Sequence, residues 1–288
     1  MRYATVDFFH DSYPIEVLCS ALSVSHSGYN QWRRRSSSTQ RQRANEQLLA
    51  RIRRIHAQSR RAYGSPRIHQ ELKRQGIRAG KERIRKLMQA HHIVGRYPRR
   101  YCRTTDSEHG QPIVANLLGQ NFQCHTPDTV WLADITYVPT AEGFLYVAAM
   151  KDLCTRKIVG WSMSHRMDTA LVIDALRMAI DRQVPSDGLI VHSDRGAQYA
   201  SHEFRGALAQ HRMPQSMSGL GNCYDNAPME SFFSSLKTEG LEQERFSTKN
   251  QARVAIFDYI EGFYNPVRLH SGIGYHSPNE YEAMLKAA

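Results

Sequence analysis

Three acidic residues occupy positions where a carboxylate is either useful in chemistry or unfavourable in a fold. Asp134 lies inside the apolar run 131–137, where an ionised side chain without a partner is destabilising. Asp194 stands at the end of a second strand-like run, 189–192, and α/β sheets present functional groups at such strand ends. Glu230 follows an Asn-Ala-Pro sequence, which is typical of a helix start and places it in the first or second turn.

The chemistry that suits three such carboxylates is the binding of divalent cations. Brought together they repel one another, and oxygen ligands without a His or Cys set favour Mg²⁺ or Mn²⁺ over Zn²⁺. Two ions about 3.5–4 Å apart can activate a water or a 3′-hydroxyl and stabilise the leaving oxygen of an in-line phosphoryl transfer. Singly, each carboxylate also has an ordinary interpretation, as a helix cap or a solvated side chain. Their joint context predicts a DNA-processing site.

The elements that must position these carboxylates form a mixed α/β sheet. Runs rich in Val, Ile, Tyr, Trp or Thr predict strands at 129–138, 144–150, 157–164 and 189–192, with a turn at Gly143. Apolar spacing predicts a helix at 169–182. Three strands, a helix and a further strand in this order predict an α/β fold. The change of period places a domain boundary near Pro127.

The region before this sheet is strongly basic. The first 100 residues carry 22 Lys and Arg but 6 Asp and Glu, whereas the remaining 188 carry 16 and 21. A basic half joined to a mildly acidic one predicts a module that binds a polyanion, attached to a part with another task. A solvated basic surface without such a partner is the alternative.

Helical patterns fill this basic half. Apolar stripes predict helices at 15–22, 25–35, 45–55, 65–72 and 81–91. Ser25 and Ser65 are expected as N-caps, and Gly76 is expected to close the fourth helix. The short, polar run 36–40 predicts a linker between the first two helices and the rest.

The last of these helices is the predicted DNA-reading element. It follows its predecessor after a short turn, and such a helix can lie in a DNA major groove. Its expected DNA contacts are Lys81, Arg83, Arg85 and Lys86. An ordinary three-helix bundle with a solvated basic face is the alternative. Arg99 and Arg100, in the irregular segment that follows, are expected to track DNA phosphates.

Cysteine spacing and hydropathy argue against several other classes of protein. Five cysteines are an odd number without a Cys-x-x-Cys pair, which argues against a disulfide framework and for a reducing compartment. The nearest candidates for a zinc site lack compact paired spacing, so no zinc is expected; they are His91, His92, Cys102, Cys124 and His125. No stretch approaches the roughly 18 apolar residues of a membrane span. We therefore expect a cytoplasmic protein.

A resemblance to a known family becomes specific at this point. The 59 residues between Asp134 and Asp194, and the 35 between Asp194 and Glu230, resemble the DD35E signature of the retroviral-integrase-like transposases. Other motifs resemble the second-frame transposases of bacterial insertion sequences that move by copy-out, paste-in. These motifs are His192-Ser193-Asp194-Arg195-Gly196, Asn226-Ala227-Pro228-Met229-Glu230, Tyr264-Asn265 with Arg268, His270, Gly274-Tyr275 and Pro278, and Tyr63-Gly64-Ser65-Pro66-Arg67-Ile68 in the helix-turn-helix region.

The resemblance implies a ribonuclease H-like catalytic core preceded by an all-α helix-turn-helix DNA-binding region. In it, Asp134, Asp194 and Glu230 are catalytic and hold two Mg²⁺ ions, for which Mn²⁺ can substitute. Implied DNA contacts are Arg67, Lys237 and Arg268, with Lys237 seven residues after Glu230 and thus on the same helix face. Implied supporting residues are His192, Arg195, Gln198, Tyr224 and Asn226. Alternatives stay open: a core role for His192, packing for Tyr224 and solvation for Lys237.

Five segments make up the predicted domain organisation. They are an N-terminal helical segment at 1–40, a basic helix-turn-helix domain at 41–100, a linker at 101–126, the catalytic core at 127–245 and a C-terminal helical extension at 246–288. By resemblance, the chain is a DNA transposase that performs Mg²⁺-dependent 3′-end cleavage and strand transfer. A non-catalytic DNA-binding regulator of transposition and a ribonuclease H-type nuclease are the alternatives.

The same resemblance implies the partners. They are the terminal inverted repeats of the element, target DNA and further copies of the chain assembled on that DNA. The chain has no sustained heptads, whereas family members resemble fusions with an upstream frame that supplies a leucine zipper. An upstream-frame (OrfA-type) protein or fusion is therefore a further expected partner. We expect the chain itself in the bacterial cytoplasm, and on the nucleoid when it binds DNA.

Overall fold

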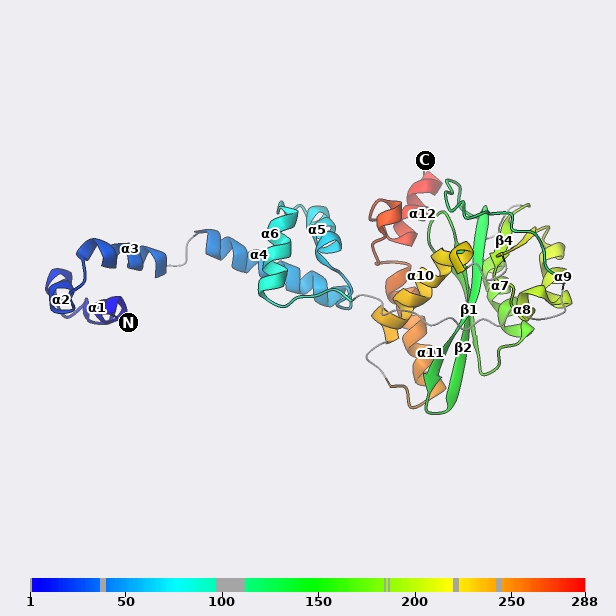
Figure 1. Cartoon of the computed structure of the whole chain (residues 1–288). Coiled ribbons are helices and arrows are strands. Elements are labelled where there is room, and N and C mark those ends of the chain that lie inside the picture. Colours follow the sequence, from blue (N-terminus) through cyan, green and yellow to red (C-terminus); the bar gives the residue numbers. More distant parts are fainter. Residues whose placement is uncertain are drawn as a thin grey trace.

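The structure has a series of helices followed by an α/β core. The computed structural model describes residues 2–36, 40–96, 112–183, 185, 187–219, 223–241 and 245–287. In the described residues, six helices precede the first strand, which begins at residue 130 (Figure 1). This order confirms the predicted all-α region before a sheet. Within the described ranges, no helix combines the length and apolar content needed to cross a membrane.

The first three helices pack around a small core of their own. They are α1 (Arg2–Phe9), α2 (Ile15–Ala21) and α3 (His26–Ser36). Val6, Cys19 and Tyr29 are buried between them, and the Tyr29 hydroxyl donates to Asp7 at 2.8 Å. The sequence did not predict α1, because only one of its apolar side chains, Val6, is buried and no clear stripe results.

The next three helices form the predicted helix-turn-helix region. They are α4 (Gln40–Gln58), α5 (Ser65–Arg74) and α6 (Lys81–Ala90). Ile52, Ile68 and Ile84, one from each helix, are fully buried and lie in the same hydrophobic cluster. The apolar faces face inward, so the basic residues are left on the outside, as the helical period requires.

Two predicted helix ends are confirmed and one shifts by a residue. The Ser25 hydroxyl accepts from the Gly28 amide at 3.0 Å, which is the expected N-terminal cap. Gly76 follows α5 with a φ of 74°, a left-handed conformation that glycine adopts readily. Gly64, rather than Ser65, is the N-cap of α5, so the serine and proline both lie in the first turn.

The core sheet has five strands in the order β3-β2-β1-β4-β5. They are β1 (Val130–Thr140), β2 (Gly143–Asp152), β3 (Ile158–Ser164), β4 (Ile190–Ser193) and β5 (Gln215–Met217). The first three are antiparallel neighbours, and β4 runs parallel to both β1 and β5. The mixed sheet confirms the predicted fold class. The three-residue β5 was not predicted, because it is too short to show a strand period.

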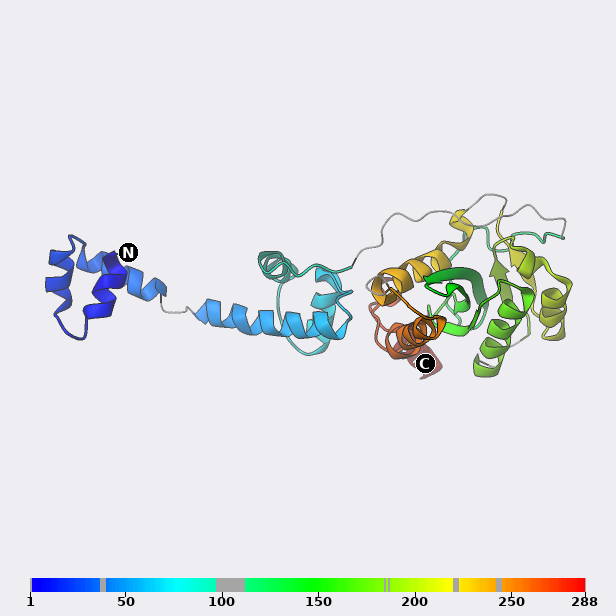
Figure 2. The same cartoon turned by 90° about the horizontal axis from the view of Figure 1, so that it is seen from below.

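Helices cover both faces of the sheet (Figure 2). On one face lie α7 (Thr169–Gln183), α8 (Ala197–Ala200) and α9 (His202–Gln210), and on the other lie α10 (Ala227–Ser235) and α11 (Lys249–Phe257). Gly160 of β3 lets α7 approach closely, because a Cβ there would lie 2.2 Å from the carbonyl oxygen of Ala175. The hydrophobic core therefore has two layers, one on each side of the strands.

The last part of the chain wraps the α10 face. Two π-helical segments, η2 (Leu236–Leu241) and η3 (Asp258–Tyr264), continue from α10 and α11, and α12 (Pro278–Ala287) ends the described chain. Gly240 permits close packing of the two segments, since a Cβ there would lie 2.8 Å from the Tyr259 ring. The Asn265 amide bonds both backbone groups of Ile158 at 2.9 and 3.0 Å, which fastens this region to β3.

Candidate active site

Strand pairing brings the two aspartates together. β1 and β4 are parallel, and Leu132 pairs with His192 in their register. Asp134 on β1 and Asp194, the residue directly after β4, each stand two residues beyond that pair, so they lie at matching points of the register. Asp134 shares a sheet face with Leu132, because side chains alternate along a strand. Leu132 packs in the cluster that includes α10, so Asp134 faces that helix.

Glu230 lies in the first turn of α10, as predicted. The helix packs against β1, and Asn226 at its N-cap donates from Nδ2 to the carbonyl oxygen of Ala133 at 3.1 Å. This bond joins the start of the Glu230 helix to the residue beside Asp134. The Asn226 side chain therefore supports the site through the backbone, while the Glu230 side chain is exposed.

The carboxylates interact electrostatically. Burial raises the pKa of Asp134 well above its usual range, and the charges of Asp194 and Glu230 raise it further. The amide of Ile135, which donates to Asp134 Oδ1 at 2.8 Å, and the charge of Lys237 oppose this rise. The order of these effects places Asp194 as the stronger acidic neighbour and Glu230 as the weaker one.

The donor set fits a hard divalent cation. The three side chains supply only oxygen atoms, and a cation among them would relieve the repulsion that raises the Asp134 pKa. In the described parts of the chain, however, no three His, Cys, Asp or Glu side chains are arranged closely enough to hold a metal ion. The two aspartates and the exposed Glu230 are therefore neighbours without forming a preassembled cage.

The predicted support residues mostly hold the backbone around Asp194. His192 is buried, and its Nδ1 lies 2.8 Å from the Ser216 hydroxyl on β5, so it has a core position. Burial lowers its pKa below the usual value. Arg195 donates from Nε to the carbonyl oxygen of Ser218 at 2.7 Å, and Gln198 donates to that of Met167 at 3.0 Å. Tyr224, which precedes α10, is 71% exposed.

Asp225 organises the approach to α10. Its carboxylate accepts from the Gly219 amide at 2.7 Å and from the side chains of Asn116 and Gln120, each at 2.9 Å. Burial acts to raise its pKa, but these hydrogen bonds outweigh burial and lower it. Residues within the predicted linker 101–126 are thus bonded to the segment that precedes Glu230.

Lys151 is a second functional candidate that the sequence analysis missed. This buried β2 lysine donates from Nζ to the carbonyl oxygen of Pro228 at 2.9 Å, two residues before Glu230. Burial, then the charges of Arg156 and Arg268, lower its pKa well below the usual value. The sequence signal for Lys151 was its place at the end of an apolar strand, because a lysine is rarely buried unless it has a partner or a function.

The predicted DNA contacts differ in where they lie in the structure. Lys81, Arg83, Arg85 and Lys86 are all exposed on α6, where the predicted groove-binding role stays a prediction. Arg99 and Arg100 lie outside the described residues. Lys237 lies in η2, so its position depends on a π-helical turn and not on the uninterrupted α-helix that the sequence suggested. Its Nζ stands 5.2 Å from the centre of the Tyr137 ring.

Two arginines predicted as DNA contacts are engaged inside the protein. Arg268 is only 6% exposed and donates to both carboxylate oxygens of Glu239 at 2.6 and 2.7 Å. An enclosed cation that is already paired cannot reach a phosphate, so the prediction for Arg268 is wrong. Arg67 donates from Nε to the carbonyl oxygen of Leu269 at 2.9 Å. It therefore lies where the helix-turn-helix region meets the C-terminal segment.

Comparison with protein families places these parts in a known arrangement. Residues 43–101 match the family model described as an HTH-like domain. Residues 125–223 and 230–285 match two models that are each described as an integrase core domain. With the five-stranded mixed sheet, these matches show that the core has the ribonuclease H-like fold that the sequence predicted. The matches cover all three carboxylates.

Relatives resemble the chain over nearly its whole length. The insertion element IS600 uncharacterized 31 kDa protein of Shigella sonnei is 42% identical over 91% of this chain and 96% of its own. Transposase InsF for insertion sequence IS3A of Escherichia coli (strain K12) is 37% identical over 98% of both chains.

Solved structures give a more distant likeness. A simian T-cell lymphotropic virus intasome in complex with PP2A regulatory subunit B56 gamma matches with a TM-score of 0.46 and 16% identity, over 80% of this chain and 73% of that one. The HTLV-2 integrase catalytic core domain in complex with magnesium matches with a TM-score of 0.43 and 14% identity, over 54% of this chain and 96% of that one. On the strength of its relatives and family matches, the chain belongs to the IS3 family of insertion-sequence transposases, as an OrfB-type protein with a DDE polynucleotidyl transferase core that acts in DNA transposition.

Proposed function

We propose that this transposase cleaves 3′ ends and transfers strands of its insertion sequence by two-metal phosphoryl transfer with Mg²⁺. The observation that carries the proposal is the matched position of Asp134 and Asp194 on paired strands, with Glu230 in the first turn of the helix above them. Three oxygen ligands of this kind suit Mg²⁺, with Mn²⁺ as a substitute. A relative's core is described in complex with magnesium, which agrees with this choice.

Each part of the site has a role in that reaction. Asp134, Asp194 and Glu230 would hold the metal ions, which, when bound, activate the attacking oxygen and stabilise the leaving one. Asn226 and Lys151 hold the start of α10 through the carbonyl oxygens of Ala133 and Pro228. The elevated pKa of Asp134 means that its ionised form is disfavoured without a cation, and a cation bound at the site would stabilise that form.

The remaining residues would bind and orient DNA. Exposed basic residues of α6 suit contact with the phosphates of the terminal repeats. Lys237, held near Asp134, is placed to contact a strand that enters the site. We propose that the chain works as a homo-oligomer on paired element ends and with an upstream-frame OrfA-type partner, in the bacterial cytoplasm. The segments 1–40, 41–100, 101–126, 127–245 and 246–288 remain the proposed domains.

Strand transfer on a labelled element-end oligonucleotide tests the proposal. The purified chain is assayed with Mg²⁺, with Mn²⁺, with EDTA and as the Glu230→Gln variant, at one stated ionic strength because counterion release makes DNA affinity depend on salt. Joined products that require both metal and Glu230 support the proposal. As a matched control, Glu203→Gln removes an exposed glutamate of α9 and should leave the products unchanged.

Two results would replace the proposal with another function. Specific binding of the ends without any cleavage or joining, also after addition of the upstream-frame protein, would indicate a regulator. Faster cleavage of an RNA·DNA hybrid than of duplex DNA would indicate a ribonuclease H-type nuclease.

A further inference from the structure

The helix-turn-helix region is docked on the catalytic core through a set of polar contacts. We call this contact the docking seam, and its residues are Tyr63, Arg67 and Arg96 on the helix-turn-helix side and Thr238, Glu239, Val267 and Leu269 on the core side. Two salt bridges, from Arg60 to Asp258 and from Arg74 to Glu280, flank it. These bonds join residues that are 142 to 206 positions apart in the chain.

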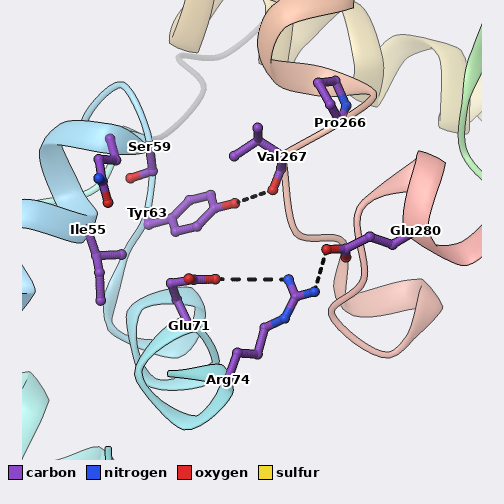
Figure 3. Close-up of a pocket in the computed structure, with 9 residues that line it drawn as sticks. Ile55, Ser59, Tyr63, Glu71, Arg74, Pro266, Val267 and Glu280 are labelled. Carbon is purple, nitrogen blue, oxygen red and sulfur yellow. Dashed lines mark hydrogen bonds and ion pairs between the residues drawn. The ribbon is translucent and has the colours of Figure 1, made fainter. Parts of the chain in front are cut away.

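Tyr63 is the centre of the seam. Its side chain is 2% exposed, and its hydroxyl accepts from the Leu269 amide at 2.8 Å and donates to the Val267 carbonyl oxygen at 3.0 Å (Figure 3). Burial raises its pKa to about 12, so the hydroxyl keeps the proton that it donates. One phenol therefore fixes the main chain on both sides of Arg268.

Arg268 links this fixed main chain to η2. Its guanidinium grips the Glu239 carboxylate with two hydrogen bonds of 2.6 and 2.7 Å, and a third bond of 3.1 Å reaches the Ser235 hydroxyl at the end of α10. The Tyr259 hydroxyl also donates to Glu239, at 3.0 Å. A planar, two-bond contact of this kind fixes orientation as well as distance.

Arg96 reaches η2 by a second route. Its Nη1 donates to the carbonyl oxygens of Glu239 at 2.7 Å and Thr238 at 3.3 Å. Gly95 makes this reach possible, because a Cβ there would lie 2.6 Å from the Gly64 nitrogen. The chain can cross the start of α5 this closely only where a side chain is missing. The Glu239 backbone is thus held directly by Arg96, and its side chain is held by Arg268, whose flanking main chain Tyr63 fixes.

The held segment is directly continuous with the catalytic helix. α10, which carries Glu230, ends at Ser235, and η2 begins at the next residue. Lys237, which lies near Asp134, is in η2. π-helical turns are rare and occur mainly at functional sites, where an external contact can stabilise their irregular backbone bonding. Arg96 provides such a contact.

We propose that Tyr63 and Arg96 are positioning residues for catalysis: by holding η2 from outside the core, they set where Glu230 and Lys237 stand over Asp134. The DNA-binding region is then a structural part of the active site as well as a means of finding the element. The hold on η2 stands by itself, whereas its effect on the reaction rests on the proposed function. The two statements can be tested separately.

Hydrogen exchange of the full-length protein, without DNA or metal, tests the hold. In Arg96→Gln and in Tyr63→Phe, which keeps the buried ring, we expect the amides of 236–241 to exchange at least about tenfold faster. The amides of β1 and β2 should keep wild-type rates, which shows that the fold is intact. Arg53→Gln removes the same charge from an exposed site of the same region and should change neither. Unchanged exchange of 236–241 in both seam variants would overturn the proposal.

Single-turnover joining of pre-cleaved ends tests the catalytic consequence. At saturating DNA, we expect the rate constant to fall about 10- to 100-fold in both seam variants, with Kd for the ends within twofold of wild type. Arg96→Lys, which keeps one donor, should recover part of the rate. Faster exchange with an unchanged saturated rate would overturn the positioning role. If the wild-type chain forms no product at all, the proposed function fails, and the exchange result still decides whether the seam holds η2.

Discussion

Asp134 with Asp194, and Glu239 with Arg268, are two charged pairs in the same core, and their charges are balanced differently. At the first pair, burial and then the like charge of Asp194 raise the Asp134 pKa. At the second, burial acts to lower the Arg268 pKa, but hydrogen bonds to Glu239 raise it above the usual value. The charges of the first pair would be balanced by the proposed cation, whereas those of the second are balanced within the chain.

One helical stretch connects the two pairs. Glu230 near its start belongs to the first site, and Glu239 in η2 belongs to the second. The Arg268–Glu239 pair can thus fix the C-terminal end of this stretch, whereas Glu230 at the N-terminal end is left for a ligand to fix. Comparing the effects of removing one charge from each pair separates these roles, since one change should affect the reaction and the other the fold.

Removal of a charge from the first pair should have the largest effect on activity. Asp134→Asn keeps the size of the side chain but takes away a metal ligand, so we expect strand transfer to fall at least about 1000-fold. The measurement is single-turnover joining with Mg²⁺. Asp187→Asn, in an exposed pair with Arg212, is the control and should react at the wild-type rate. Joining above about a tenth of wild type in Asp134→Asn would show that Asp134 is no ligand.

Removal of a charge from the second pair should have the largest effect on stability. Arg268→Met leaves the Glu239 carboxylate enclosed without its cation, and we expect the free energy of unfolding to fall by about 3–5 kcal/mol. Urea unfolding measures it. In Arg212→Met, the lost pair is exposed and the expected change is about 0–1 kcal/mol. Equal changes in the free energy of unfolding of the two variants would mean that the buried Arg268–Glu239 pair stabilises the fold no more than the exposed Arg212–Asp187 pair does.

Magnesium should stabilise the first pair and leave the second unaffected. Mg²⁺ binds the folded site only, so at saturation we expect it to raise Tm of the wild type by roughly 3 °C or more. In EDTA, Asp134→Asn should melt above the wild type, because carboxylate repulsion is removed, and it should lose most of the response to Mg²⁺. A full Mg²⁺ response in that variant would place the stabilising ion elsewhere.

The smallest effect should come from His270, which lies beside the second pair. Burial and then the charge of Arg268 lower its pKa well below the usual value. The unfolded chain takes up a proton on this ring below about pH 6.5, and the folded chain does not, so the free energy of unfolding should decrease as pH falls from 7 to 5. In His270→Gln this decrease should be smaller. Exposed His211→Gln is the control and should retain the wild-type slope.

Local patterns in the sequence were sufficient for four of the five strands and for the secondary-structure positions of the three carboxylates, whose catalytic role stays a prediction. The strands at 129–138 and 189–192 were predicted, and their parallel pairing in the structure places Asp134 beside Asp194. Glu230 was placed correctly because an Asn-Ala-Pro sequence marks a helix start. These features depend on residues close together in the chain.

The docking seam could not be predicted in the same way. Tyr63 and Val267 are 204 residues apart, and no period or spacing relates them. Arg268 was misjudged because arginine is usually exposed, and only the folded chain shows Glu239 enclosed with it. Lys237 was placed by an α-helical period, whereas it lies in the π-helical segment η2, in which Gly240 packs closely against Tyr259.

The pairing of β1 with β4 also bears on how this protein can change over generations. The 59 residues between the aspartates include β2, β3 and α7. The chain then returns along β4 to its pairing with β1. An insertion at the exposed turn around Glu142 would lengthen that interval without moving either carboxylate. The number of residues between the two aspartates can therefore vary among descendants of this protein, whereas the register in which β1 pairs with β4 must stay the same.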